Sequence, residues 1–170
     1  LEKSITLMKE IWEIFYNKDN QLLQKNRIKK NDLFVNPIDL NDNNIPNGNS
    51  VYLNLCNKLY IITNEKIWFE KIEILKKSFH QVLNSFFSQM FSFIKTLDMC
   101  EDSISFTFFG NIDLIKDVKN NLQKKFLGIA TFIHKDKDEK KASIVVCKNQ
   151  ICSEKLNNMD EIINFMKNKF

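Results

Sequence analysis

The spacing of the hydrophobic residues changes near residue 101, and this change constrains the fold more than any other feature of the sequence. Before that point, apolar residues recur every three or four positions, as they do on one face of a helix. Beyond it, Phe106 and Phe108 alternate with Ser105 and Thr107, which is the period of a strand. The sequence therefore predicts an α+β protein in two parts, residues 1–100 and residues 101–170.

The first part should begin with an amphipathic helix followed by a long loop. Apolar residues from Ile5 to Phe15 recur at helical spacing, and the helix is expected to end near residues 17–20. Residues 20–49 contain both prolines of the chain and a cluster of Asn and Asp. These residue types favour turns, so we expect a loop over this range.

Three more helices should follow the loop. A side chain from Asn49 or Ser50 can cap the second helix. The third carries an apolar stripe that includes Trp68, with a break near residues 84–85, and the fourth follows from Met90. Because short joints between amphipathic helices favour antiparallel packing, we expect helical hairpins.

The second part predicts a small α/β unit. A strand over residues 103–109 is followed by a turn at Gly110, a helix that Gly128 could cap, and a second strand over residues 130–134. A strand–helix–strand unit predicts a right-handed crossover with parallel strands. A hairpin around residues 148–150 and a closing helix complete a unit with a mixed sheet.

Composition excludes several classes of function. The net charge of +4 is modest and Arg27 is the only arginine, so we expect no nucleic-acid partner. No apolar run approaches the roughly 20 residues that span a bilayer, so no membrane partner is expected. The three glycines form no phosphate-binding loop, and we expect no cofactor.

Cys147 and Cys152 are a candidate thiol pair, because they lie at opposite ends of the predicted hairpin and could face each other. The favoured interpretation is that both are packing thiols. A disulfide, a metal site and a redox role remain open. Redox activity would favour a two-residue spacer and a helix N-terminus. A zinc site needs four ligands, and His134 with two cysteines supplies three, so no metal is predicted.

Three stretches resemble the C-terminal part of a known family. The first runs from Pro37 to Ser50 and looks like the signature RPKDxxDxAxPSGNS of that family. The second is Phe106–Gly110, and the third joins Cys147–Cys152 to Met159 and the acidic pair after it. The family comprises the bacterial YyaL-type proteins and the animal spermatogenesis-associated protein 20.

The resemblance implies an order of domains. In that family a thioredoxin-like domain comes first, then an (α/α)₆ barrel of the six-hairpin glycosidase type, then a small α/β portion. Residues 1–100 would therefore be the terminal helices of the barrel, and residues 101–170 the small subdomain. The implied partners are the remainder of the barrel and the upstream thioredoxin-like domain.

The resemblance also marks the loop as a candidate site for a small molecule or sugar. Two carboxylates, Asp39 and Asp42, could act as the acid and base of a glycosidase, but three residues apart they are also typical of turns and caps. Gly48 is expected to supply a positive φ, which would aim amides into a barrel mouth or close the loop. The candidate site residues are Asp39, Asp42, Asn43, Pro46, Gly48, Asn49 and Ser50.

Three functions follow as expectations. The first is the C-terminal fragment of a carbohydrate-active enzyme, itself inactive, located in the cytoplasm. The second is a thioredoxin-linked redox or thiol protein whose barrel is a binding module. The third is a non-catalytic scaffold, since Asn36 and Ile38 stand where the family tends to have Arg and Lys. No catalytic residue can be named from the sequence.

Overall fold

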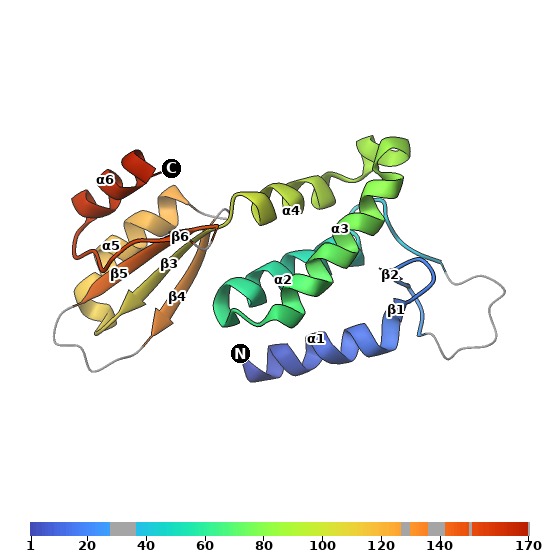
Figure 1. Ribbon diagram of the computed structural model, residues 1–170, viewed down its shortest axis with the longest axis horizontal. Helices are drawn as coiled ribbons and strands as arrows, with labels where there is room; N and C mark the ends of the chain where they lie inside the picture. Colours follow the sequence, from blue (N-terminus) through green and yellow to red (C-terminus); the bar gives the residue numbers. More distant parts are fainter. Residues whose placement is uncertain (28–36, 127–129, 136–141, 150, 170) are drawn as a thin grey trace. The chain divides into compact units, whose positions relative to one another are not determined.

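The computed structural model describes residues 1–27, 37–126, 130–135, 142–149 and 151–169. Its contacts divide the chain into two compact units, Leu1–Cys100 and Glu101–Phe170. The division lies where the hydrophobic spacing changes from helical to strand-like. The protein is α+β, as predicted, with helices in both units and a mixed sheet in the second (Figure 1).

The first unit is mainly helical. A short antiparallel ladder follows its first helix, and its second strand lies inside the range predicted to be a loop. The joint between the second and third helices is two residues long, with Asn64 in the left-handed region at φ 57°. The elements are α1 (Glu2–Phe15), β1 (Tyr16–Asn17), β2 (Leu22–Leu23), α2 (Gly48–Thr63), α3 (Lys66–Phe86), η1 (Phe87–Gln89) and α4 (Phe91–Glu101).

The core of this unit is built on α3. Trp68, Leu75 and Phe79 recur along one face of α3 and have no exposed surface. Phe79 stacks on Phe93 of α4, with 4.0 Å between ring centroids. The predicted break near residues 84–85 is misplaced, because α3 continues to Phe86 before η1 interrupts it.

The second unit contains a four-stranded sheet in the order β4-β3-β5-β6. β3 pairs parallel with β4, and β5 pairs antiparallel with β3 and β6, so the predicted parallel pairing and the predicted hairpin are both confirmed. The elements are β3 (Ile104–Phe109), α5 (Ile112–Lys125), β4 (Ala130–Lys135), β5 (Ser143–Lys148), β6 (Ile151–Cys152) and α6 (Met159–Lys169).

The two faces of this sheet differ. Phe106 and Phe108 of β3 pack with Val146 of β5 against Leu122 of α5 and Ile162 of α6, and all five are fully buried. Figure 1 shows both helices on that side of the sheet. Because side chains alternate along a strand, Ser105, Thr107 and Cys147 belong to the opposite face.

Local signals begin α5. Gly110 has a φ of 90°, and the Asn111 side chain accepts a hydrogen bond of 2.9 Å from the Asp113 amide. Gly128, the predicted cap, lies outside the described residues, as does most of the charge run at 135–141. Among the described helices, none is long and apolar enough to cross a membrane.

The burial of Phe106 yields a stability prediction. Phe106→Ala should lower the free energy of unfolding by about 3–5 kcal/mol, because it removes a ring from a closed core. Ile151→Ala is the control, since Ile151 is 68% exposed and its loss should change stability by no more than about 0.5 kcal/mol. Urea denaturation followed by circular dichroism measures both. Equal losses would contradict the packing described above.

Candidate functional site

Asn47 caps α2, so the cap expected at Asn49 or Ser50 is wrong by two or three residues. Its backbone is extended, and its side-chain oxygen accepts a hydrogen bond of 2.9 Å from the Ser50 amide. Gly48 is therefore the first helical residue. The prediction of a positive φ at Gly48 is wrong. Among the described glycines, Gly110 has a positive φ and Gly48 does not.

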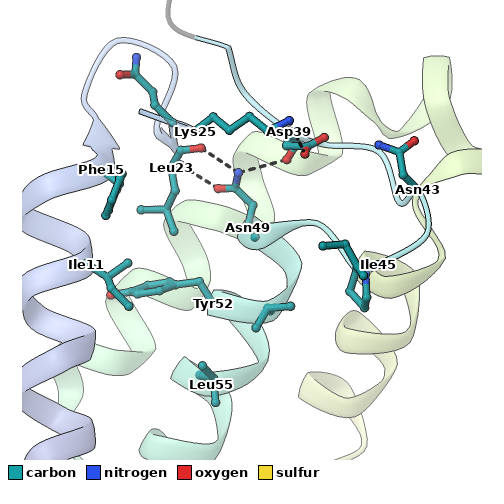
Figure 2. A pocket seen from close by; sticks show the side chains of 14 residues that line it. Ile11, Phe15, Leu23, Lys25, Asp39, Asn43, Ile45, Asn49, Tyr52 and Leu55 are labelled. Carbon is teal, nitrogen blue, oxygen red and sulfur yellow. Dashed lines mark hydrogen bonds and ion pairs between the residues drawn. The ribbon is translucent and has the colours of Figure 1, made fainter. Parts of the chain in front are cut away.

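Asn49 joins three segments of the chain. Its side-chain oxygen accepts a hydrogen bond of 2.7 Å from the Leu23 amide, and its side-chain nitrogen donates to the Leu23 carbonyl at 2.9 Å. The same nitrogen donates to the Asp39 carbonyl at 3.3 Å. Figure 2 shows this side chain reaching from α2 to β2 and the loop. Asn49 thus satisfies the backbone of β2 as a neighbouring strand would.

Asp42 is engaged by the fold. One carboxylate oxygen accepts hydrogen bonds of 3.0 Å from both the amide and the side-chain nitrogen of Asn47. The other accepts the Ser92 amide at the beginning of α4. Burial by itself raises the pKa of Asp42, but the hydrogen bonds from Ser92 and Asn47 outweigh it, so the net pKa is lowered. A carboxylate held this way is a cap and not a proton donor.

A pocket opens between α1, the loop and α2, with a cavity volume of about 480 Å³. Most of its lining is apolar. Five of the candidate loop residues line it, and these are Asp39, Asn43, Pro46, Gly48 and Asn49. Asp42 and Ser50 are not part of the lining. The structure therefore brings most of the predicted loop residues to one site, although their roles differ.

The other wall of the pocket was not predicted from the sequence. Ile11 and Phe15 of α1 and Leu23 of β2 lie across from α2 in Figure 2. Ile11 and Phe15 lie more than 30 residues before the start of α2 at Gly48. The available sequence signal was on α2, where the apolar residues Val51 and Leu55 are four positions apart. In the structure these side chains are 43% and 41% exposed. Ile45 beside them is 74% exposed.

Polar groups lie at one end of the pocket. The Lys25 ammonium is 3.2 Å from the Asp39 carboxylate, and both side chains are partly exposed. Gln24, also in the lining, is almost fully buried, and its side-chain oxygen has no hydrogen-bond partner among the described residues. The Tyr52 hydroxyl is already used, since it donates to the Met8 carbonyl at 2.8 Å. Burial raises the pKa of Tyr52 above its ordinary value.

Gly48 leaves space in this pocket. A Cβ atom built on Gly48 would have no atom within 4 Å. A side chain at this position would therefore extend into open volume and not into packed protein. The absence of a side chain at the first turn of α2 helps to keep the pocket open.

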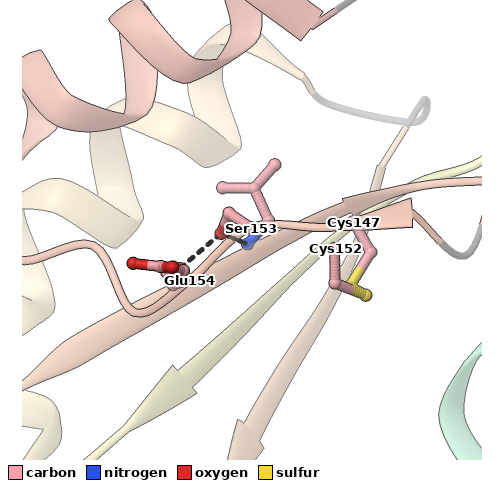
Figure 3. The surroundings of a disulfide bond; sticks show 5 residues. Cys147, Cys152, Ser153 and Glu154 are labelled. Atoms are coloured by element: carbon pink, nitrogen blue, oxygen red, sulfur yellow. Dashed lines mark hydrogen bonds between the residues drawn. A yellow bond between two sulfur atoms is a disulfide. The ribbon is translucent and has the colours of Figure 1, made fainter.

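Cys147 and Cys152 form a disulfide, so the interpretation as packing thiols is wrong. The register pairs Cys147 directly with Cys152, and their Cα atoms are 4.0 Å apart (Figure 3). The Ser153 amide donates to the Val146 carbonyl at 2.8 Å, so the cysteines occupy the non-hydrogen-bonded position between two ladder pairs. Side chains are closest at such positions, which explains the bridge.

The other two cysteines, Cys56 and Cys100, form no disulfide. Cys56 is fully buried, and burial raises its pKa to about 12. Cys100 is half-buried. Within the described ranges, no three His, Cys, Asp or Glu side chains are placed to hold a metal ion.

No family model, curated protein or solved structure matches this chain. The resemblance to the YyaL-type proteins therefore stays a prediction.

The role of Asp42 can be tested by substitution. Asp42→Ala should lower the free energy of unfolding by about 2 kcal/mol, because it leaves amides at Ser92 and Asn47 without their acceptor. Asp39→Ala is the matched control, and the loss of its partly exposed ion pair should cost less than about 1 kcal/mol. Urea denaturation at pH 7 compares the two. A larger loss for the Asp39 variant would contradict these roles.

The same carboxylate predicts a pH dependence. Because the folded-state pKa of Asp42 is lowered below its ordinary value of 3.8, its stabilisation is present above that value. It should be lost as the pH falls through the folded-state pKa. The difference in unfolding free energy between the wild type and Asp42→Ala should therefore shrink below about pH 4. A difference that stays constant or grows down to pH 2 would contradict the assignment.

Proposed function

We propose that the first unit is a binding module that holds a mainly apolar small molecule between α1, the loop and α2. The observation that carries this proposal is the open pocket of about 480 Å³ beside Gly48. Ligand pockets in proteins span about 300–1,000 Å³ and are mostly apolar with a few polar groups. Here Phe15, Val51 and Leu55 supply apolar surface, and Lys25 and Asp39 supply polar contacts at one end.

The arrangement of carboxylates favours binding over acid–base catalysis. Two carboxylates must face a glycosidic bond in the usual hydrolytic mechanisms. In this pocket Asp39 is the one acidic side chain among the described lining residues. Asp42, the other candidate, is occupied by Asn47 and Ser92.

The wider proposal concerns the whole protein. The resemblance implies that this chain is the C-terminal part of a cytoplasmic protein with a thioredoxin-like domain and a six-hairpin barrel. Large apolar side chains are exposed outside the pocket, among them Leu7 on α1, Phe69 on α3 and Phe91 on α4. Exposed apolar surface of this kind supports contact with further helices. A thioredoxin-linked role, with the barrel as a binding module, is compatible with this proposal.

A carbohydrate-related reaction is the second candidate. It is favoured by Asp39, whose carboxylate is about one-third exposed, and by the aromatic rings of Phe15 and Tyr52 in the same pocket. A second carboxylate would have to come from outside the described residues. Titration with neutral disaccharides distinguishes the candidates, because a sugar site should shift the Asp39 and Tyr52 NMR signals and an apolar site should not.

Gly48 provides a direct test of the binding proposal. Gly48→Leu should fill part of the pocket without a clash, because no atom lies within 4 Å of its Cβ position. We expect it to weaken the binding of Nile red, a neutral apolar dye, about tenfold, which is about 1.4 kcal/mol. Gly48→Ala adds only a methyl group and should change binding less than about twofold. Fluorescence titration measures both.

A second control separates the pocket from other apolar surface. Phe91 is 65% exposed and is not part of the pocket lining. Phe91→Ser should leave dye binding unchanged. The proposal fails if the wild type shows no saturable binding, or if Gly48→Leu binds as tightly as the wild type.

A further inference from the structure

The Cys147–Cys152 disulfide lies where reagents can reach it. Val146, one residue before Cys147, faces the core under α5 and α6. The alternation of side chains therefore places the disulfide on the opposite face of the sheet. Both residues of β6 are exposed, whereas Cys147 is half-buried. Figure 3 shows the sulfur atoms on the side of β5 away from the helices. Cys152 is thus the more accessible half of the bridge.

The chain on the turn side of the disulfide has other attachments. The Lys148 ammonium is 2.8 Å from the Asp102 carboxylate. The Asn149 amide donates to the Ser103 carbonyl at 3.0 Å, and the Asn149 side-chain oxygen accepts the Ser103 amide at 3.1 Å. These contacts connect the tip of the hairpin to the beginning of β3.

The chain after the disulfide is attached as well. The Val146 amide donates to the Ser153 hydroxyl at 3.0 Å, and Ile144 and Leu156 exchange two backbone hydrogen bonds of 2.7 and 2.8 Å. One residue separates Ile144 from Val146 on β5, whereas two separate Ser153 from Leu156 on the facing segment. The extra residue makes a bulge, a feature that fixes strand register. Breaking the disulfide would therefore leave both cysteines opposite each other.

We propose that this disulfide is a reversible electron acceptor for a dithiol, either a protein dithiol or a small molecule. A thiolate of the dithiol attacks the Cys152 sulfur. The bond between the two cysteines breaks, and Cys147 leaves as a thiolate that takes up a proton. The second thiol of the dithiol loses its proton and attacks the other dithiol sulfur, the one bonded to Cys152. Cys152 is released and takes up a proton to become a thiol. The dithiol is oxidised by two electrons, and the chain gains two thiols.

The surroundings suit an acceptor better than an attacking thiol. Attacking cysteines need a lowered pKa, which a helix N-terminus or an unpaired cation provides. Cys147 and Cys152 lie on strands, and the neighbouring Lys148 is paired with Asp102. Exposed disulfides are more readily reduced than buried ones. The retained register favours return to the oxidised state when an oxidised dithiol is present, so the exchange is reversible.

The first experiment locates the attacked sulfur. Native protein is treated briefly with reduced glutathione and quenched with acid, and the mixed disulfides are identified by mass spectrometry. Trypsin cleaves after Lys148 and Lys155, so residues 142–148 and 149–155 separate the two cysteines into different peptides. We expect the glutathione adduct on Cys152 to exceed that on Cys147 about tenfold. An equal distribution, or an excess on Cys147, would overturn the proposed order of attack.

The second experiment tests reversibility. Dithiothreitol should reduce the bridge in the native protein without urea, and removal of the reductant with addition of oxidised dithiothreitol should restore it. Circular dichroism should be unchanged throughout. Reduction that requires urea, or that unfolds the chain, would show that the bridge is only a structural crosslink.

Matched variants keep the test independent of folding. Cys147→Ser/Cys152→Ser should keep cooperative unfolding and show no reaction with dithiothreitol. Cys56→Ser/Cys100→Ser retains the bridge and removes the two cysteines that form no disulfide, so it should be reduced and reoxidised at the wild-type rate. Loss of folding in the first variant, or a tenfold slower reaction in the second, would contradict the proposal. The first variant does not bear on dye binding beside Gly48, because its cysteines lie in the second unit and the pocket lies in the first.

Discussion

The hydrogen bonds of Asn49 determine how the first unit is assembled. A buried amide side chain that donates and accepts at Leu23 replaces a missing strand neighbour, and it also holds the Asp39 carbonyl. Without those bonds, the Leu23 amide and carbonyl would be buried without partners, which is unfavourable by about 1–3 kcal/mol for each group. The ladder of β1 and β2, the loop and α2 therefore depend on one side chain.

Most polar residues of the loop support the structure and are not free for a ligand. Asn47 and Asp42 cap α2 and α4, and Asn49 satisfies β2. Residues of the same types are common in ligand sites, so their presence in a loop does not separate the two uses. What separates them here is whether their hydrogen bonds are already made. On that criterion Asp39 and Lys25 remain able to exchange their ion pair for a ligand, and Asp42 does not.

Periodicity predicted most elements, and local chemistry predicted fewer details. The alternation from Ser103 to Phe108 and the stripe of the following helix were sufficient to predict the parallel crossover, because both signals are short-range. The cap of α2 was misplaced by two or three residues, since Asn47, Asn49 and Ser50 are all suitable capping residues. The pocket could not be predicted, because it requires α1 to face a segment about 30 residues later. The disulfide required the register of β5 and β6, which cysteine spacing alone does not give.

The two sites place different demands on the fold. A pocket for an apolar ligand needs surface left unfilled, and Gly48 meets this need at the first turn of a helix, where the lack of a side chain is tolerated because the N-terminal amides are capped from Asn47. A reversible disulfide needs well-attached chain segments, because its cysteines must stay in place when the bond is absent. The bulge at Ser153 and the contacts of Asn149 do this without covering Cys152. The hydrogen bond from the Ser50 amide to Asn47 allows α2 to begin at a glycine beside the pocket. The hydrogen bonds of Asn149 and Ser153 hold the hairpin in place on both sides of the disulfide.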